Sequence, residues 1–147
     1  MGVALLAAKR SKDPSTQVGA CIVDEHNIII STGYNGLPIG CSDDEYSWAR
    51  EGEDTKYQYV VHAELNTILN ATGKSLRGAK LYVSLFPCNE CAKAIIQSGI
   101  TEVIYLSDKY AHTQSTRTSR RMLASAGVST RQLKPSNDHL VIDFNVK

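Results

Sequence analysis

Hydrophobic and polar positions along the chain follow two different periods, and the changes between them predict an α/β fold. Runs rich in β-branched and aromatic residues, each bounded by turn-forming residues, predict strands at Gln17–Val23, Ile28–Gly33, Lys80–Leu85, Glu102–Leu106 and Val128–Leu133. Segments of helix-forming residues predict helices at Val3–Arg10, His62–Ala71, Cys88–Ser98 and Ser115–Ala126. This order predicts a three-layer α/β/α sandwich built on a five-stranded mixed sheet.

The connections between the predicted strands indicate their directions. The first two strands are separated by the polar segment Asp24–Asn27, which predicts an antiparallel hairpin. The last two are separated by the helix Ser115–Ala126, which predicts a parallel pair joined by a right-handed crossover. A chain of 147 residues is long enough for one sizeable core, so we expect a single domain over residues 1–147.

The periodicity fails between Tyr34 and Tyr59. Asn35-Gly36-Leu37-Pro38 opens this stretch, and acidic clusters follow it. A loop of this length inside a compact domain is usually functional or disordered. Because it ends just before His62, we expect it to serve a function.

Four residues form the candidate chemical centre: His62, Glu64, Cys88 and Cys91. We expect them in the first turns of two successive helices, where Cys88 and Cys91, three apart, share one helix face. A histidine and two thiolates with one open position is the ligand set of a catalytic zinc, because structural zinc sites are usually closed by four ligands. The H-x-E…P-C-x-x-C order is the signature of zinc-dependent nucleobase deaminases.

Glu64 is assigned to proton transfer rather than to metal binding, because it lies two residues from His62 and projects along a different line. Zinc lowers the pKa of bound water to about 7, and Glu64 would move the proton from that water to the base ring and the departing amine. The competing interpretation is a structural zinc with a fourth ligand. Its candidates are Cys41, His26, His112 and His139, none of which has a metal-ligand spacing.

Several stretches together resemble the deoxycytidylate (dCMP) deaminases. They are Ser11-Lys12-Asp13-Pro14, Gly33-Tyr34-Asn35-Gly36, Val61–Asn66, Phe86–Lys93, Gln97–Ile100 and Ser107–Tyr110. The resemblance implies a cytidine deaminase-like fold, one Zn²⁺ per subunit, and hydrolysis of dCMP to dUMP and ammonia for thymidylate synthesis. It also implies a homohexamer that dCTP activates and dTTP inhibits.

The same resemblance suggests substrate-binding residues. It implies that Asn35 contacts the sugar hydroxyl, that the N–H of Ala63 holds the base carbonyl, and that Pro87 borders the base. For the 5′-phosphate the chain offers two candidate pairs, Lys109 with Tyr110 after a strand and Lys12 with Ser15 before one. Without the resemblance, Asn35-Gly36 would be interpreted as a common turn pair. Each of the two lysines would be interpreted as a solvated surface charge.

The loop between Tyr34 and Tyr59 is also the candidate effector site, with Asn35, Gly36, Asp43 and Asp44 as its residues. The carboxylates of Asp43 and Asp44 either hold Mg²⁺ on a triphosphate or form a solvated acidic face. From the residues alone, the solvated acidic face is the favoured interpretation.

Composition restricts the alternatives. A net charge of +1, two Phe and one Trp disfavour a deaminase of tRNA or single-stranded DNA, which needs a basic groove with stacking platforms. A nucleoside deaminase lacks the crossover helix, and a non-enzymatic paralogue would usually have lost Glu64 or a zinc ligand.

The apolar start Val3–Ala8 is too short for a signal peptide or a membrane span, so we expect a cytoplasmic protein, with the nucleus as a second compartment.

Overall fold

The computed structural model describes residues 1–145 and has the predicted architecture. Four α-helices and five strands follow one another as α1 (Gly2–Ala8), β1 (Gly19–Val23), β2 (Ile29–Tyr34), α2 (Ala63–Asn70), β3 (Lys80–Leu85), α3 (Asn89–Ser98), β4 (Glu102–Ser107), α4 (Gln114–Ser125) and β5 (Ser129–Gln132). A short 3-10 helix, η1 (Lys56–Gln58), interrupts the long loop. The predicted elements are thus confirmed, with bounds that differ by at most two residues.

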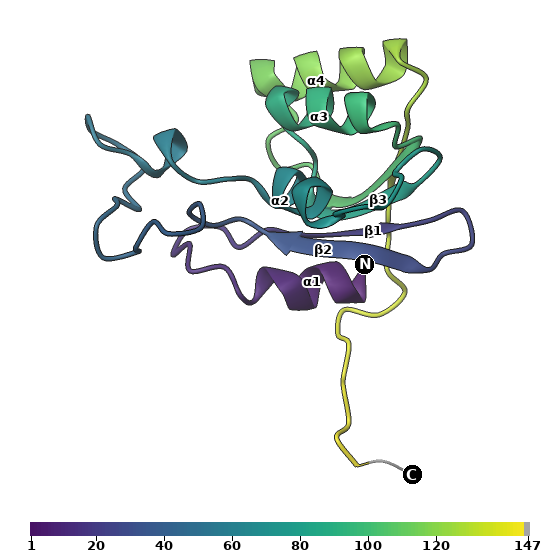
Figure 1. Ribbon diagram of the computed structural model, residues 1–147, viewed down its shortest axis with the longest axis horizontal. Coiled ribbons are helices and arrows are strands. Elements are labelled where there is room, and N and C mark those ends of the chain that lie inside the picture. Colours follow the sequence, from purple (N-terminus) through teal and green to yellow (C-terminus); the bar gives the residue numbers. More distant parts are fainter. Residues whose placement is uncertain (146–147) are drawn as a thin grey trace.

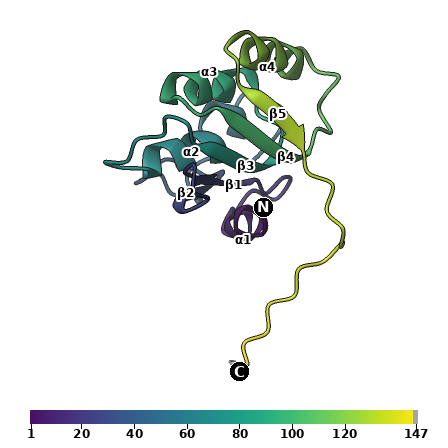
Figure 2. The ribbon, with the colours of Figure 1, turned by 90° about the vertical axis from the view of Figure 1, so that its right-hand side faces the viewer.

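The five strands form one mixed sheet in the order β2-β1-β3-β4-β5. β1 pairs antiparallel with both β2 and β3, whereas β3, β4 and β5 are parallel. The predicted hairpin and the predicted parallel pair joined by α4 are therefore confirmed. Figures 1 and 2 show α1 on one face of the sheet and α2, α3 and α4 side by side on the other, which gives the predicted three layers.

The larger core lies between the sheet and the three-helix layer. Its fully buried side chains include Ile22 of β1, Leu81 and Val83 of β3, Ile95 of α3 and Leu123 of α4. These residues alternate along the strands, so that one side of each central strand faces α2–α4. On the other face of the sheet, Ala4 of α1 forms a smaller cluster with Cys21 and Val23 of β1. The thiol of Cys21 is therefore buried, as a free cysteine in a core usually is.

A close approach of α2 to β2 depends on Gly33. A Cβ atom added to Gly33 would lie 2.6 Å from the backbone nitrogen of Thr67 and 2.9 Å from the carbonyl oxygen of Ala63. Any side chain here would push away the helix that begins at the metal-binding histidine. The Gly33–Gly36 stretch thus has a packing requirement besides its predicted role in substrate binding.

The long loop is closed at its base by backbone hydrogen bonds. Gly36 and Val61 form an isolated antiparallel bridge, with N···O distances of 3.1 and 2.8 Å. The loop therefore leaves the sheet after β2 and returns to it next to His62, where Figure 1 shows it extending beyond the end of the sheet. Among residues 1–145, the helices are all too short or too polar to cross a bilayer.

Candidate active site

The histidine of the candidate site occupies the N-cap position of α2. His62 has an extended backbone, with φ −70° and ψ 153°, and its carbonyl accepts the first intrahelical bond, from the N–H of Asn66 at 3.0 Å. We expected His62 inside the first turn, and the structure places it one position earlier. This position leaves the N–H groups of Ala63 and Glu64 without intrahelical partners, since the first turn of any helix lacks acceptors for them.

The two cysteines are arranged in the same way at the start of α3. Cys88 is the N-cap residue, again one position before the predicted first turn, and its sulfur accepts a hydrogen bond from the N–H of Cys91 at 3.5 Å. Thiolates are favoured there because the N-terminus of a helix carries a partial positive charge. Asn89 adds a link to α4, because its side-chain oxygen accepts a hydrogen bond from the Ser115 hydroxyl at 2.7 Å.

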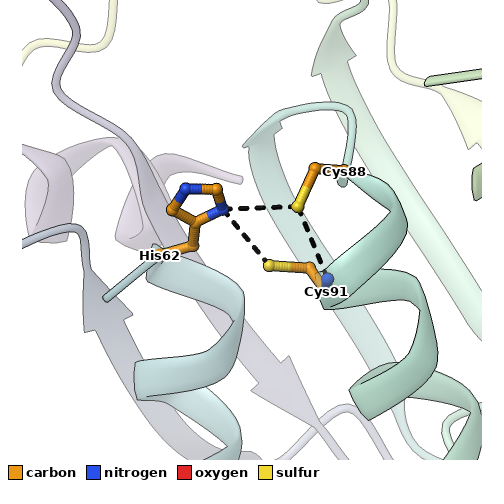
Figure 3. Close-up of side chains that lie close together, drawn as sticks. All are labelled: His62, Cys88 and Cys91. Carbon is orange, nitrogen blue, oxygen red and sulfur yellow. Dashed lines mark hydrogen bonds between the residues drawn. The ribbon is translucent and has the colours of Figure 1, made fainter. Parts of the chain in front are cut away.

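The three predicted ligands converge on one point, and we call them the zinc cradle (His62, Cys88 and Cys91). Nδ1 of His62 lies 3.4 Å from the sulfur of Cys88 and 3.5 Å from that of Cys91, and Figure 3 shows the three side chains facing one another. All three ligand atoms lie within 4.8 Å of one another. Tetrahedral zinc with ordinary Zn–N and Zn–S bonds separates such N and S ligands by about 3.5 Å. The donor set and its spacing therefore fit zinc.

The protonation of the cradle without metal also suits a cation. The hydrogen bond to Cys88 raises the pKa of His62 to about 8 in spite of its burial. A hydrogen bond from Cys91 lowers the pKa of Cys88 to about 4, whereas donating that bond and being buried raise the pKa of Cys91. One sulfur thus holds negative charge at neutral pH, and two protons remain for a metal ion to displace.

Glu64 is buried beside the cradle, with 4% of its surface exposed, and it lines the same cavity as His62 and Cys88. Burial raises the pKa of Glu64 to about 7, and the charge of His62 limits the increase. A carboxyl group of this kind exchanges protons readily at neutral pH, which general acid–base catalysis requires.

The cavity in front of the cradle has a volume of about 330 Å³, within the range of small-molecule sites. Ala63, Asn35, Leu85 and Phe86 form part of its inner wall. Its outer part, which we call the cavity mouth (Thr16, Arg50, Tyr57 and Tyr110), carries polar and cationic groups. Nε of Arg50 donates a hydrogen bond to the Tyr57 hydroxyl at 3.1 Å.

The sequence interpretation missed several cavity residues. Arg50, Lys56, Tyr57 and Ser115 line the cavity, yet no motif or spacing indicated them. The available signal for the first three was their position in the long loop just before His62, which was expected to be functional as a whole. Ser115 had a signal of another kind, because it opens the helix that was predicted to join the last two strands.

Of the four residues in the two predicted phosphate-binding pairs, only Tyr110 lines the cavity. Tyr110 lines the cavity, while Lys109 is exposed and stacks over the Tyr110 ring with its Nζ 5.1 Å from the centroid. Lys12 lies outside the cavity lining and forms an exposed ion pair with Asp43 at 2.6 Å, and Ser15 donates its N–H to Asp13. Asn35 and Ala63 line the cavity.

The remaining predicted residues lie outside the cavity lining. Pro87 is fully buried between Phe86 and Cys88, which both line the cavity. Gly36 forms the bridge at the base of the long loop, and Asp44 lies further along that loop, next to Asp43. Cys41, the alternative zinc ligand in that loop, is not part of the group formed by His62, Cys88 and Cys91.

Comparisons with known proteins agree with this geometry. The family model for the cytidine and deoxycytidylate deaminase zinc-binding region matches residues 1–107. The chain is 55% identical to deoxycytidylate deaminase of Mus musculus and 53% identical to that of Homo sapiens, each over 99% of this chain and 83% of the relative.

A solved structure gives the same result for the fold. The dCMP deaminase from the cyanophage S-TIM5, in complex with dCMP and dUMP, superposes with a TM-score of 0.72 and 26% identity, over 90% of this chain and 92% of the phage protein. The fold, the zinc cradle and these relatives together show that the chain belongs to the cytidine and deoxycytidylate deaminase family.

Proposed function

We propose that this chain deaminates dCMP hydrolytically, giving dUMP and ammonia, with one zinc ion held by His62, Cys88 and Cys91. The observation that carries the proposal is that the zinc cradle and the buried carboxyl group of Glu64 open into one cavity of nucleotide size. Relatives that are 53–55% identical are named deoxycytidylate deaminases, which selects dCMP among the pyrimidine substrates.

Zinc, when bound, supplies a Lewis acid that makes hydroxide available at neutral pH. The carboxylate of Glu64 takes the proton of the attacking water and delivers it to N3 of the cytosine ring. Glu64 then takes the second proton of that water from the hydroxyl group formed on C4 and passes it to the amino group, which leaves as ammonia while C4 becomes a carbonyl. Burial raises the pKa of the Glu64 carboxyl group above its ordinary value, which helps it to accept each proton before passing it on.

The inner wall orients the base and the sugar. The N–H of Ala63 lies at the start of α2 without an intrahelical acceptor, and it is assigned to the base carbonyl oxygen. Phe86 borders the base, with Pro87 buried next to it in the chain, and Asn35 receives the sugar hydroxyl. Closing the base between these buried groups keeps bulk water from the reacting carbon.

The cavity mouth is proposed to hold the 5′-phosphate, with Arg50 as the principal cation. Its guanidinium uses one N–H on Tyr57 and keeps further donors for a phosphate. Tyr110, from the loop after β4, adds a hydroxyl group to the same cavity mouth. Lys12 and Ser15 are placed second, because Lys12 is already paired with Asp43.

Regulation and assembly form the less direct part of the proposal. A homohexamer activated by dCTP and inhibited by dTTP follows from the family resemblance, with the effector near Asn35, Gly36, Asp43 and Asp44. Mg²⁺ would accompany the triphosphate at Asp43 and Asp44. The free thiols of Cys21, Cys41, Cys88 and Cys91 fit a reducing compartment, which supports a cytoplasmic location, with the nucleus second.

The direct test is ammonia release by the zinc-loaded protein from dCMP, cytidine, dCTP and a short deoxycytidine oligonucleotide. The highest kcat/KM is expected for dCMP, and a preference for any of the other three would overturn the proposal. Adding dCTP or dTTP at low dCMP concentration tests the regulation, since opposite changes in rate are expected. Light scattering in the same buffers tests the hexamer.

A further inference from the structure

The side chain of Asn35 is held by protein partners on nearly every polar position. Its Oδ1 accepts a hydrogen bond from the N–H of Val18 at 2.8 Å, and its Nδ2 donates to the carbonyl of Thr16 at 3.0 Å and to Oδ2 of Asp13 at 3.2 Å. Both amide hydrogens are therefore used, and the free capacity is one lone pair on Oδ1. Towards the cavity, Asn35 can act as an acceptor and not as a donor.

This orientation of the Asn35 amide has no workable alternative. Turning the amide over would place its NH₂ group against the N–H of Val18, and its oxygen against the Thr16 carbonyl and the Asp13 carboxylate. Each of the three contacts would then join two donors or two acceptors. The side chain is 6% exposed, so water cannot relieve these conflicts.

Asp13 enforces the orientation because it is itself a saturated acceptor. Its two oxygens receive Nζ of Lys56 at 2.8 and 2.6 Å, and Oδ1 also receives the N–H groups of Ser15 and Thr16 at 2.8 and 3.1 Å. Burial favours the neutral acid, but the hydrogen bonds from Lys56 and from the two backbone groups outweigh it and hold the pKa of Asp13 below its ordinary value.

Lys56 connects this network to the long loop. It belongs to η1, and the side chains of Lys56 and Asp13 are only 8% and 3% exposed. Lys56, Asp13 and Asn35 all line the cavity, so the pair lies next to Asn35 and beside the place proposed for the sugar. A buried pair of this kind has little freedom to rearrange, which makes it suitable for fixing a neighbour.

We infer that the buried Lys56–Asp13 pair is a positioning device that fixes Asn35 as an acceptor, so that the site selects nucleotides whose sugar presents a hydrogen-bond donor. The inference rests on the proposed function. In dCMP the 5′ oxygen is esterified and the 2′ position carries hydrogen, so the donor is the 3′-hydroxyl. A buried acceptor left without its donor carries a desolvation cost, and this is the source of the selectivity.

The wild-type enzyme tests the acceptor character directly. The zinc-loaded protein is given dCMP, its 2′,3′-dideoxy analogue, and the analogues with 3′-fluoro and 3′-amino groups, and kcat/KM is measured by ammonia release. The dideoxy and 3′-fluoro analogues, which lack a donor, are expected to lose about 10²-fold or more, whereas the 3′-amino analogue is expected to retain more activity than either. Equal use of the fluoro and hydroxyl compounds would overturn the inference.

Variants test the positioning role. Asp13→Asn and Lys56→Met are compared with Asn35→Ala, and the quantity measured is the kcat/KM ratio of dCMP to its dideoxy analogue. Because the backbone groups of Val18 and Thr16 still hold the Asn35 amide, the ratio is expected to fall severalfold in the two positioning variants, and to within about tenfold of unity only in Asn35→Ala. A merely structural role would lower both rates together and leave the ratio unchanged, which would contradict the inference.

Two controls complete the design. Lys93→Met breaks an exposed ion pair with Glu90 and is expected to keep the wild-type ratio. Zinc content and thermal unfolding establish that each variant is folded, and if neither positioning variant folds, the analogue series on the wild type decides. Failure to release ammonia from dCMP overturns the proposed function and this inference with it, whereas activity on dCMP with no discrimination at the 3′ position overturns the inference alone.

Discussion

The zinc cradle and the cavity mouth lie in one cavity but are built in different ways. The ligands of the cradle come from the N-caps of α2 and α3 and from the first turn of α3, which are successive helices along the chain. Two short sequence segments therefore determine the positions of the ligands. The mouth assembles Thr16, Arg50, Tyr57 and Tyr110 from three separate loops. We infer from the difference that the reaction is specified locally, by motif spacing, while the substrate is specified by long-range packing.

The largest expected effect separates catalysis from binding within the cradle region. Glu64→Gln removes the proton carrier while keeping the shape of the side chain, so kcat for dCMP is expected to fall by about 10²- to 10⁴-fold. KM and the zinc content, measured by metal analysis, are expected to change little.

The matched control is Glu90→Gln, which alters an exposed carboxylate between the two cysteines that pairs with Lys93. It is expected to leave kcat near the wild-type value. If Glu64→Gln instead kept near-full turnover with zinc bound, the assignment of Glu64 would be wrong, and the cradle would no longer account for the chemistry.

The second effect concerns the cavity mouth and is expected in KM. Arg50→Gln removes the proposed phosphate cation, and the loss of one charged hydrogen-bonding partner raises KM for dCMP by about 10- to 100-fold. The activity towards cytidine, which has no phosphate, is expected to change much less. Steady-state kinetics with both substrates measure the difference.

Arg10→Gln serves as its control, because Arg10 is exposed and stacks over Tyr34 instead of lining the cavity. An equal loss for dCMP and cytidine in Arg50→Gln would show that Arg50 supports the loop and does not bind phosphate. The phosphate assignment would then return to Lys12 and Ser15 or to Lys109.

The same contrast explains how far the sequence could be interpreted. Strand and helix order, the parallel pair around α4 and the zinc ligands follow from local pattern, and the structure has the fold that this pattern predicted. The network of Asp13, Asn35 and Lys56 could not be derived, because its members are up to 43 residues apart and a buried lysine has no sequence signature. Lys12, four residues before Thr16 of the mouth, was selected on charge alone, and its side chain lies on the surface.

Arg120 of α4 links the two regions, and its replacement is expected to have an intermediate effect. Its guanidinium carbon lies 4.1 Å from the ring centroid of Phe86, and Nη2 binds Asp108 at 2.8 Å, at the start of the loop that carries Tyr110. Arg120→Met keeps the apolar stem but loses both interactions. We expect a loss of about 1–2 kcal/mol in the free energy of unfolding, measured by urea titration.

The kinetic consequence of Arg120→Met follows from the same contacts. KM for dCMP is expected to rise severalfold, since Tyr110 is less firmly placed, while the zinc content stays constant. The neighbouring Arg121→Met, at an exposed position of the same helix, is expected to change the free energy of unfolding by less than about 0.5 kcal/mol. Similar losses in the free energy of unfolding in both variants would show that Arg120 does not connect the zinc cradle with the cavity mouth.

The last comparison is between two ion pairs of the same residue types, and the replacement in the exposed pair has the smallest expected effect. Lys12–Asp43 and Lys56–Asp13 both have N···O distances of 2.6 Å, but the first pair is largely exposed and the second is buried. Asp43→Asn is expected to leave the free energy of unfolding close to the wild-type value, because solvent screens the exposed pair. Asp13→Asn is expected to cost about 3–5 kcal/mol at neutral pH, because it leaves Lys56 charged and buried without its partner.

The pH dependence of that cost distinguishes the two pairs further. The pKa of Asp13 lies below its ordinary value in the folded protein, so its stabilising contribution is fully present above the unfolded-state pKa and is lost as the pH falls through the folded-state pKa. At low pH the wild type loses the stabilisation that Asp13→Asn already lacks. The difference in free energy of unfolding between the two proteins, measured by urea titration, should therefore shrink. Release of zinc at low pH affects both proteins alike and cancels in that difference. A cost of Asp13→Asn that stays constant down to the lowest pH would mean that its origin is packing and not the buried charge.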